Sequence, residues 1–249
     1  MQNTLTLKKP EQNKSYKPVK NLLSPGATNI KTAKNDLETY ILYMAPASTV
    51  EGLNLCPFAS KGCTDGCLYS SGRGKFSNVQ LARINKSKFW GYDRENFYIQ
   101  LGNELLKIYG KAKINAHKIA IRLNGTSDID HLHLLERYTG INFLSNEYDN
   151  LLFYDYTKNP NHVSRYKNTR YKITFSRSES NEAEAKVILK NGGNIAVVFS
   201  GELPEYYLGY PVINGDLTDL RYFDPSNVIV GLKAKGDAKK DKSGFVVRL

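Results

Sequence analysis

The stretch from residue 40 to residue 67 begins with the apolar run Tyr40-Ile-Leu-Tyr-Met-Ala45 and ends with Cys56-Pro-Phe-Ala-Ser-Lys-Gly-Cys63-Thr-Asp-Gly-Cys67. The apolar run has the length of a strand, and a helical pattern begins at Ser77. The cysteine loop, residues 52–75, therefore lies between a predicted strand and a predicted helix. In α/β proteins, functional sites are built on loops that connect such elements.

All three cysteines of the protein lie in this loop, with the spacing C-x6-C-x3-C. A disulfide would leave one cysteine over, and residues 1–20 lack the apolar core of a signal peptide. Structural zinc needs four ligands, but the nearest downstream histidine is His117. Three thiolates with one open position suit a catalytic zinc ion or a [4Fe-4S] cluster with one free iron, and we favour the cluster. Three cysteines without metal are the remaining alternative.

The basic residues are concentrated at the two ends of the chain, which has 249 residues and a formal net charge of +11. Residues 1–35 carry a net charge of +6, and residues 233–249 carry +4. Basic ends attract polyanions, so we expect nucleic acid as a partner. No apolar run reaches the roughly 18 residues of a membrane span, so we expect no membrane partner.

Short apolar runs alternate with helical patterns along the chain, as is typical of parallel βαβ units. The predicted strands are residues 39–46, 118–123, 151–155, 171–175, 194–199 and 228–232. Helical patterns run from Ser77 to Trp90 and from Asp93 to Gly110. A closed eight-stranded barrel needs about 250 residues of βα units. We therefore predict an α/β fold with a partial or opened (βα) barrel of about six parallel strands, with a doubly wound sheet as the alternative.

The predicted domain organisation has two parts. Residues 1–35 are predicted to form an extended basic arm. Residues 36–249 are predicted to form a single barrel-like domain that ends in a basic tail, residues 233–249. Residues 245–249 of that tail have the apolar character of a final strand.

Polar residues follow several predicted strands, at the edge of the sheet where barrel enzymes carry their chemistry. Asp128, Asp155 and Asp216 are candidates for acid–base catalysis or substrate binding. Asn124 and Ser176 are candidates for cofactor binding beside the cysteines.

Charged side chains near these positions are candidates for binding a phosphate or carboxylate of the substrate. They are Arg122, Lys158, Arg177, Asp219, Arg221, Lys233 and Lys235. Structural ion pairs between these arginines and aspartates are the alternative interpretation.

A cysteine cluster after the first strand of a partial barrel resembles the radical S-adenosylmethionine enzymes. In those enzymes a three-cysteine loop holds a [4Fe-4S] cluster, and its free iron binds the methionine part of S-adenosylmethionine. The resemblance implies Cys56, Cys63 and Cys67 as cluster ligands and S-adenosylmethionine as a cofactor. The spacing in those enzymes is usually C-x3-C-x2-C, whereas this chain has C-x6-C-x3-C.

A closer resemblance, over residues 40–248, is to the phage gene product 88 family. The matching motifs are Cys56…Cys63…Cys67-Leu-Tyr, Arg122…Gly125…Asp128, Asp155-Tyr-Thr-Lys158, Asp216…Asp219-Leu-Arg221 and Val230-Gly-Leu-Lys-Ala-Lys-Gly236. This resemblance implies a phage or mobile-element source and, with it, the cytoplasm of an infected bacterial host. It implies no particular reaction.

The function predicted from these observations is that of a phage-type intracellular enzyme with an iron–sulfur, radical S-adenosylmethionine-like site that modifies nucleic acid or a nucleotide. One alternative is a zinc enzyme resembling the 7-deazaguanine transglycosylases that modify DNA, in which Asp128 and Asp155 would be the two aspartates. Another is a non-catalytic nucleic-acid-binding protein in which metal stabilises the cysteine loop.

Overall fold

The computed structural model describes residues 5–8, 16–26, 37–70 and 72–249. Across these residues runs one sheet of mostly parallel strands that does not close, with the order β1-β2-β3-β4-β5-β6-β9-β8-β7 and β10 beside β6. The strands are β1 Leu23–Pro25, β2 Thr39–Leu42, β3 Ile119–Arg122, β4 Leu151–Thr157, β5 Lys172–Ser176, β6 Asn194–Phe199, β7 Tyr206–Tyr207, β8 Tyr210–Asn214, β9 Ile229–Lys233 and β10 Val246–Val247.

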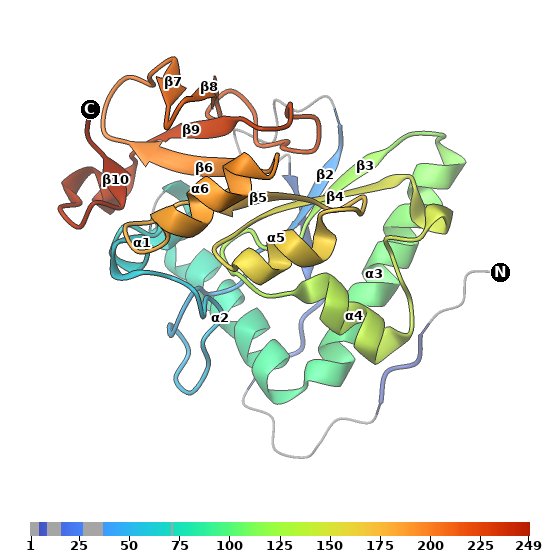
Figure 1. Cartoon of the computed structure of the whole chain (residues 1–249). Helices are drawn as coiled ribbons and strands as arrows, with labels where there is room; N and C mark the ends of the chain where they lie inside the picture. The colour runs from blue at the N-terminus through green and yellow to red at the C-terminus, as the bar shows by residue number, and fades with distance from the viewer. Residues whose placement is uncertain (1–4, 9–15, 27–36, 71) are drawn as a thin grey trace.

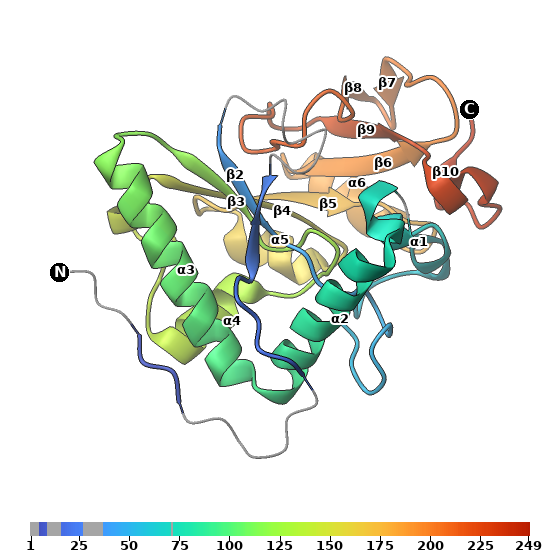
Figure 2. The same cartoon turned by 180° about the vertical axis from the view of Figure 1, so that it is seen from behind.

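The helices α2, α3, α4 and α5 lie below the strands in Figure 1 and in the reverse view of Figure 2. The α-helices are α1 Lys61–Asp65, α2 Ser77–Tyr92, α3 Arg94–Ile114, α4 His131–Thr139, α5 Pro160–Tyr166 and α6 Glu182–Lys190. Short 3-10 helices are η3 Leu68–Ser70, η4 Gly72–Lys75, η5 Asn146–Tyr148 and η6 Gly236–Lys240. Among the described residues no helix is both long enough and apolar enough to cross a membrane.

The six strands predicted from the sequence are neighbours in the sheet. β2, β3, β4, β5, β6 and β9 are paired in parallel in that order. The expected barrel of about six strands is confirmed only in its coarser part, a mostly parallel sheet. The sheet remains open, and its two edges end in the antiparallel pairs β1–β2 and β7–β8. β1 and β7 contain too few residues to have been predicted as strands, and β8 contains Pro211, which weakens its strand pattern.

Alternating residues of β4 divide the sheet into two faces. Leu151 and Phe153 belong to the large hydrophobic core that also contains α3 and α4 side chains. Tyr154 points to the opposite face, where it packs with Ala120 and Leu220. Because strand residues alternate with a period of two, β3 and β4 present an apolar face to the helices and a partly polar face to the loops above.

Helix α3 extends past its predicted end. Gly110 was predicted to terminate it, but the helix continues to Ile114. An apolar stripe of the helix faces the core, since Phe97, Leu101 and Leu105 are fully buried and Ala112 extends the same buried face by a further turn. One glycine costs a helix only about 1 kcal/mol, so Gly110 does not have to end it.

The described parts of residues 1–35 lie against the protein. The main chain of Leu5 donates a hydrogen bond to Asn103 (2.8 Å), and those of Leu22 and Leu23 donate to Glu104 (2.7 and 2.8 Å). Leu22 is fully buried, and β1 pairs with β2. The predicted extended basic arm is not confirmed, because residues 1–4, 9–15 and 27–35 lie outside the described part of the chain.

We predict that Leu22→Ala lowers the free energy of unfolding by about 2–5 kcal/mol, because it removes a fully buried side chain and leaves a cavity. Urea unfolding followed by circular dichroism measures the change. Leu7→Ala is the matched control: Leu7 is 54% exposed, so its truncation should change stability by less than about 0.5 kcal/mol. Equal effects of the two variants would contradict the packing of this segment.

Candidate functional site

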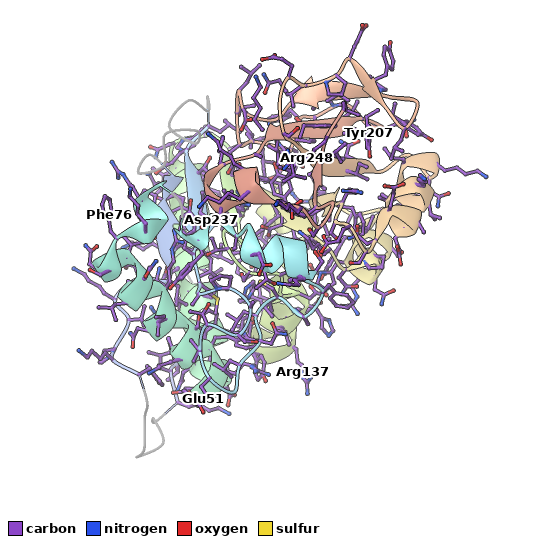
Figure 3. All side chains as sticks on the ribbon, turned by 90° about the vertical axis from the view of Figure 1, so that its left-hand side faces the viewer. Glu51, Phe76, Arg137, Tyr207, Asp237 and Arg248 are labelled. Atoms are coloured by element: carbon purple, nitrogen blue, oxygen red, sulfur yellow. The ribbon has the colours of Figure 1, made fainter. Side chains whose placement is uncertain are left out.

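The cysteine loop is built around the short helix α1. The Ser60 hydroxyl accepts a hydrogen bond from the Cys63 main-chain N–H (3.2 Å) and so caps the helix, and Gly66 follows its end. Gly62 has no space for a side chain, because a Cβ there would lie 2.3 Å from Ser243 Oγ. Helix α1 therefore packs directly on the C-terminal segment, and η6, which carries Asp237, lies beside it in Figure 3.

Glu179, which follows the end of β5, attaches the cysteine loop to the sheet. Its two carboxylate oxygens accept hydrogen bonds from the Ser60 hydroxyl and the Gly62 main-chain N–H, both at 2.8 Å. Sequence analysis missed this residue. The only signal was an acidic side chain four residues beyond a predicted strand, at the edge expected to carry the site.

Asp128, after β3, makes a second attachment. Its main-chain N–H donates to the Leu55 carbonyl (2.8 Å), one residue before Cys56. Its buried carboxylate accepts from the Thr157 hydroxyl (2.6 Å) and the Lys158 main-chain N–H (2.8 Å). The cysteine loop is thus joined to the carboxyl ends of β3, β4 and β5, as the sequence predicted for this edge.

The three thiols form no disulfide, are partly buried and are close enough to affect one another. Burial is the main cause that raises the pKa of Cys56 to about 12. The charges of Asp128, Cys67 and Cys63 act in the same direction, and a hydrogen bond to the backbone of Ala47 acts against them. Burial also raises the pKa of Cys67, while the positive charges of Lys158 and Arg83 act in the opposite direction. These two thiols are therefore protonated at neutral pH unless a cation compensates their charge.

The candidate donor set for a metal is the three thiols of one loop. Within the residues that the structure describes, no three histidine, cysteine or acidic side chains surround one point as the ligands of one metal ion would. In an iron–sulfur cluster each thiolate binds a different iron, so the sulfurs need not share a single centre. Three soft thiolates from one loop are typical ligands for such a cluster.

Comparison with protein families gives one match, to the family described as gene product 88, over residues 9–249. The chain belongs to the gene product 88 family. This match supports the resemblance seen in the sequence motifs and fits a phage protein. No curated protein and no solved structure matches the chain. The resemblance to radical S-adenosylmethionine enzymes therefore has no support from these comparisons.

Asp155 is fully engaged by the fold of this gene product 88 protein. Its carboxylate accepts hydrogen bonds from the main chain of Leu123 (3.0 Å) and Asn124 (2.8 Å) and from the Tyr171 hydroxyl (2.7 Å). Burial raises the pKa of Asp155 to about 6, although Arg122 and these hydrogen bonds favour the charged form. These contacts indicate a residue that holds β3, β4 and β5 together.

Asn124 also holds its own loop. Its amide nitrogen donates to the Ile129 carbonyl, and its amide oxygen accepts from the Ile129 main chain and the Ser127 hydroxyl, each at 2.9 Å. The carbonyl of Ser176, the last residue of β5, accepts from Asn181 (3.1 Å). Cofactor binding by Asn124 and Ser176 stays a prediction without a contact that favours it.

A separate charged cluster lies around Tyr156 on the sheet face opposite the helices. Arg122 Nη1 donates to Asp219 (2.7 Å), and its guanidinium lies 4.9 Å from the Tyr156 ring centroid. Arg221 donates from Nη2 to the Thr218 carbonyl (2.7 Å) and lies 3.3 Å from Asp224. These contacts match the structural ion pairs given above as the alternative for Arg122, Asp219 and Arg221.

The remaining predicted residues fix the last strands and the C-terminal segment. Asp216 accepts hydrogen bonds from the Lys233 main chain (2.8 Å) and the Lys235 ammonium (2.6 Å). Arg177 donates to the carbonyls of Gly244 (2.5 Å) and Phe245 (3.2 Å). The structure therefore attaches Arg177 to the segment that covers α1, and it pairs Asp216 with Lys233 at the end of β9 and with Lys235 beyond it.

We predict that Asp155 makes the protein less stable as pH rises. Its pKa is about 6 when folded and near its ordinary 3.8 when unfolded, so the folded state binds the extra proton between these values. The free energy of unfolding should fall by about 3 kcal/mol between about pH 4 and about pH 6 on account of this group alone. Urea unfolding of the wild type and Asp155→Asn across this range measures it.

The Asp155→Asn variant should lose this part of the pH dependence, whatever its overall stability. Asp149→Asn, on an exposed turn, is the control and should keep the wild-type slope. Parallel pH profiles for the wild type and Asp155→Asn would contradict the raised pKa.

Proposed function

We propose that this chain is an iron–sulfur-dependent phage enzyme that acts on nucleic acid or a nucleotide in the cytoplasm of an infected bacterial host. The observation that carries the proposal is the group of three mutually influencing thiols at the carboxyl edge of a mostly parallel sheet. A purely structural loop has no need of three neighbouring thiols outside any disulfide. Burial raises the pKa of Cys56 and Cys67, and the charge of Asp128 acts in the same direction on Cys56.

Cys56, Cys63 and Cys67 would hold the cluster. When bound, such a cluster supplies one-electron transfer and one iron that no cysteine occupies. The proposal includes S-adenosylmethionine as a ligand of that iron, and the cysteine pattern is the basis for including it. The zinc alternative would use the same thiolates with one open position.

Asp128 is the acid–base candidate nearest to the thiols, because its charge acts on Cys56. Its Oδ1 atom accepts from Thr157 and lies 4.0 Å from Nδ1 of His162, whose Nε2 lies 3.7 Å from Asp130. The Thr157 hydroxyl also lies 3.3 Å from Nδ1 of His162, so hydrogen bonds that can carry a proton connect Asp128 through Thr157 to α5. Sequence analysis had not singled out Thr157 or His162.

The nucleic-acid part of the proposal is supported by charge. The C-terminal segment that packs on α1 exposes Lys239, Lys240, Lys242 and Arg248. Exposed cations beside a candidate site attract a phosphate backbone and raise the rate of association.

We predict that the protein, reconstituted with iron and sulfide under anaerobic conditions, takes up about one [4Fe-4S] cluster. Cys56→Ala, Cys63→Ala and Cys67→Ala should each abolish uptake, because each removes one of only three thiolates. Iron and sulfide analysis with an ultraviolet–visible spectrum measures it. Asp216→Ala, whose carboxylate pairs with Lys235, is the control and should retain the cluster. Stoichiometric zinc without iron in anaerobic native preparations would refute the cluster.

We also predict that Lys239→Ala, Lys240→Ala and Lys242→Ala together flatten the salt dependence of single-stranded DNA binding. Each lost phosphate contact should reduce the slope of log K against log salt by about 0.7, or about 2 for the three. Fluorescence anisotropy across a salt series measures the slope. A control that removes equal charge, Lys107→Ala with Lys167→Ala and Lys190→Ala on exposed helical positions, should leave it unchanged. Equal slopes for both triple variants would exclude this surface as the contact.

A further inference from the structure

Two cations near Cys67 have no acidic partner. Arg83 projects from α2, and Lys158 directly follows β4. The Arg83 guanidinium lies 5.6 Å from the ring centroid of Tyr69, two residues after Cys67. The Lys158 main chain donates to Asp128, whose own main chain bonds the carbonyl of the residue before Cys56. In the part of the chain that the structure describes, neither side chain forms an ion pair with a carboxylate, and the Lys158 ammonium lies 5.7 Å from the Phe245 ring centroid.

The Arg83 guanidinium has buried hydrogen-bond donors without acceptors. Its Nε and Nη1 atoms and the hydroxyl of Tyr69 are buried and have no hydrogen-bond partner among the residues that the structure describes. The guanidinium lies 4.8 Å from the Tyr43 ring centroid and 5.6 Å from that of Tyr69. Burial lowers the pKa of Arg83, so the site holds the cation at a cost in free energy. Buried unpaired donors are rare in folded proteins and call for an acceptor.

Another arginine of the same helix pair shows the ordinary arrangement. Arg94 stacks on Trp90 at 4.1 Å, and its Nε donates to the Trp90 carbonyl (3.4 Å). Stacking on an aromatic ring therefore does not by itself leave the donors of an arginine unpaired in this protein. Buried donors without a partner also occur on Arg122, Arg177 and Arg221, but each of those arginines pairs with a carboxylate. Among the described residues Arg83 has no such carboxylate, and it is the arginine beside the cysteines.

We propose that Arg83 and Lys158 bind a phosphate group of the nucleotide or nucleic acid on which the cysteine site acts, an inference that rests on the proposed function. Two cations match the charge of a phosphate, and its oxygens can accept hydrogen bonds from Arg83 Nε, Arg83 Nη1 and the Tyr69 hydroxyl. The rings of Tyr43 and Tyr69 hold the guanidinium by cation–π contacts, so the donors are positioned before the ligand arrives. The phosphate would then place the rest of the substrate beside Cys67.

Calorimetric titration of the purified full chain tests this site. The probes are guanosine 5′-monophosphate, guanosine and a six-nucleotide single-stranded DNA. Arg83→Gln should weaken binding of the monophosphate roughly ten- to hundredfold, the effect of losing hydrogen bonds to a charged group, and should leave guanosine binding unchanged. Arg83→Lys should restore part of the affinity, because it keeps the charge. Arg94→Gln is the matched control and should bind like the wild type.

The two sources of phosphate give different results. If Arg83→Gln loses affinity for both the monophosphate and the DNA, the site binds phosphate from either source. If the wild type binds only the DNA, and Arg83→Gln loses that binding, the site is specific for the polymer. Unchanged phosphate affinity in Arg83→Gln, or an equal loss in Arg94→Gln, overturns the proposal. Loss of iron with unchanged phosphate affinity also overturns it, since Arg83 would then serve only the cluster. If the protein takes up no iron but still binds phosphate through Arg83, the phosphate site is supported and the iron–sulfur proposal is refuted.

Discussion

Carboxylates that accept main-chain N–H groups hold the carboxyl edge of this sheet together. Parallel strands end with unpaired N–H groups, and a buried donor without a partner costs about 1–3 kcal/mol. Asp155 accepts from the chain after β3, Asp128 accepts from the chain after β4, and Glu179 accepts from Gly62 in the cysteine loop. Each carboxylate lies on one segment and satisfies a neighbouring one, so the loops of this edge depend on each other for their positions.

The same contacts set the chemistry of the thiols. Asp128 must be near Cys56 because its main chain bonds the Leu55 carbonyl, and its charge then opposes ionisation of that thiol. Arg83 and Lys158 supply positive charge at Cys67, on the other side of α1 in the chain. The loop thus has one thiol near a negative group and another near two positive groups. A cation bound between the two thiols would stabilise the thiolate form of Cys56, which Asp128 disfavours. An anion would be attracted to Arg83 and Lys158 beside Cys67.

The sequence predicted the parallel order of strands because each strand is a short apolar run that is separated from the next by a helical pattern. It also predicted that Asp128 would lie at the same edge as the cysteines. It could not show which contacts the aspartates make, because Asp155 and Asp128 both follow or end an apolar run. Only the structure shows that Asp155 is occupied by Leu123, Asn124 and Tyr171. Arg83 could not be recognised as part of the site, since nothing near it in the sequence indicates that Tyr43 and Tyr69 lie against it.

An open sheet differs from a closed barrel in having two free edges, and exposed edges can recruit strands from other molecules and cause aggregation. Here one edge is β1, which has three residues and ends at Pro25, whose nitrogen cannot donate a hydrogen bond. The other edge is β7, which has two residues. Both are too short to offer a long ladder of unpaired donors and acceptors. The sheet therefore stays open without presenting a long edge strand on which a strand of another molecule could pair.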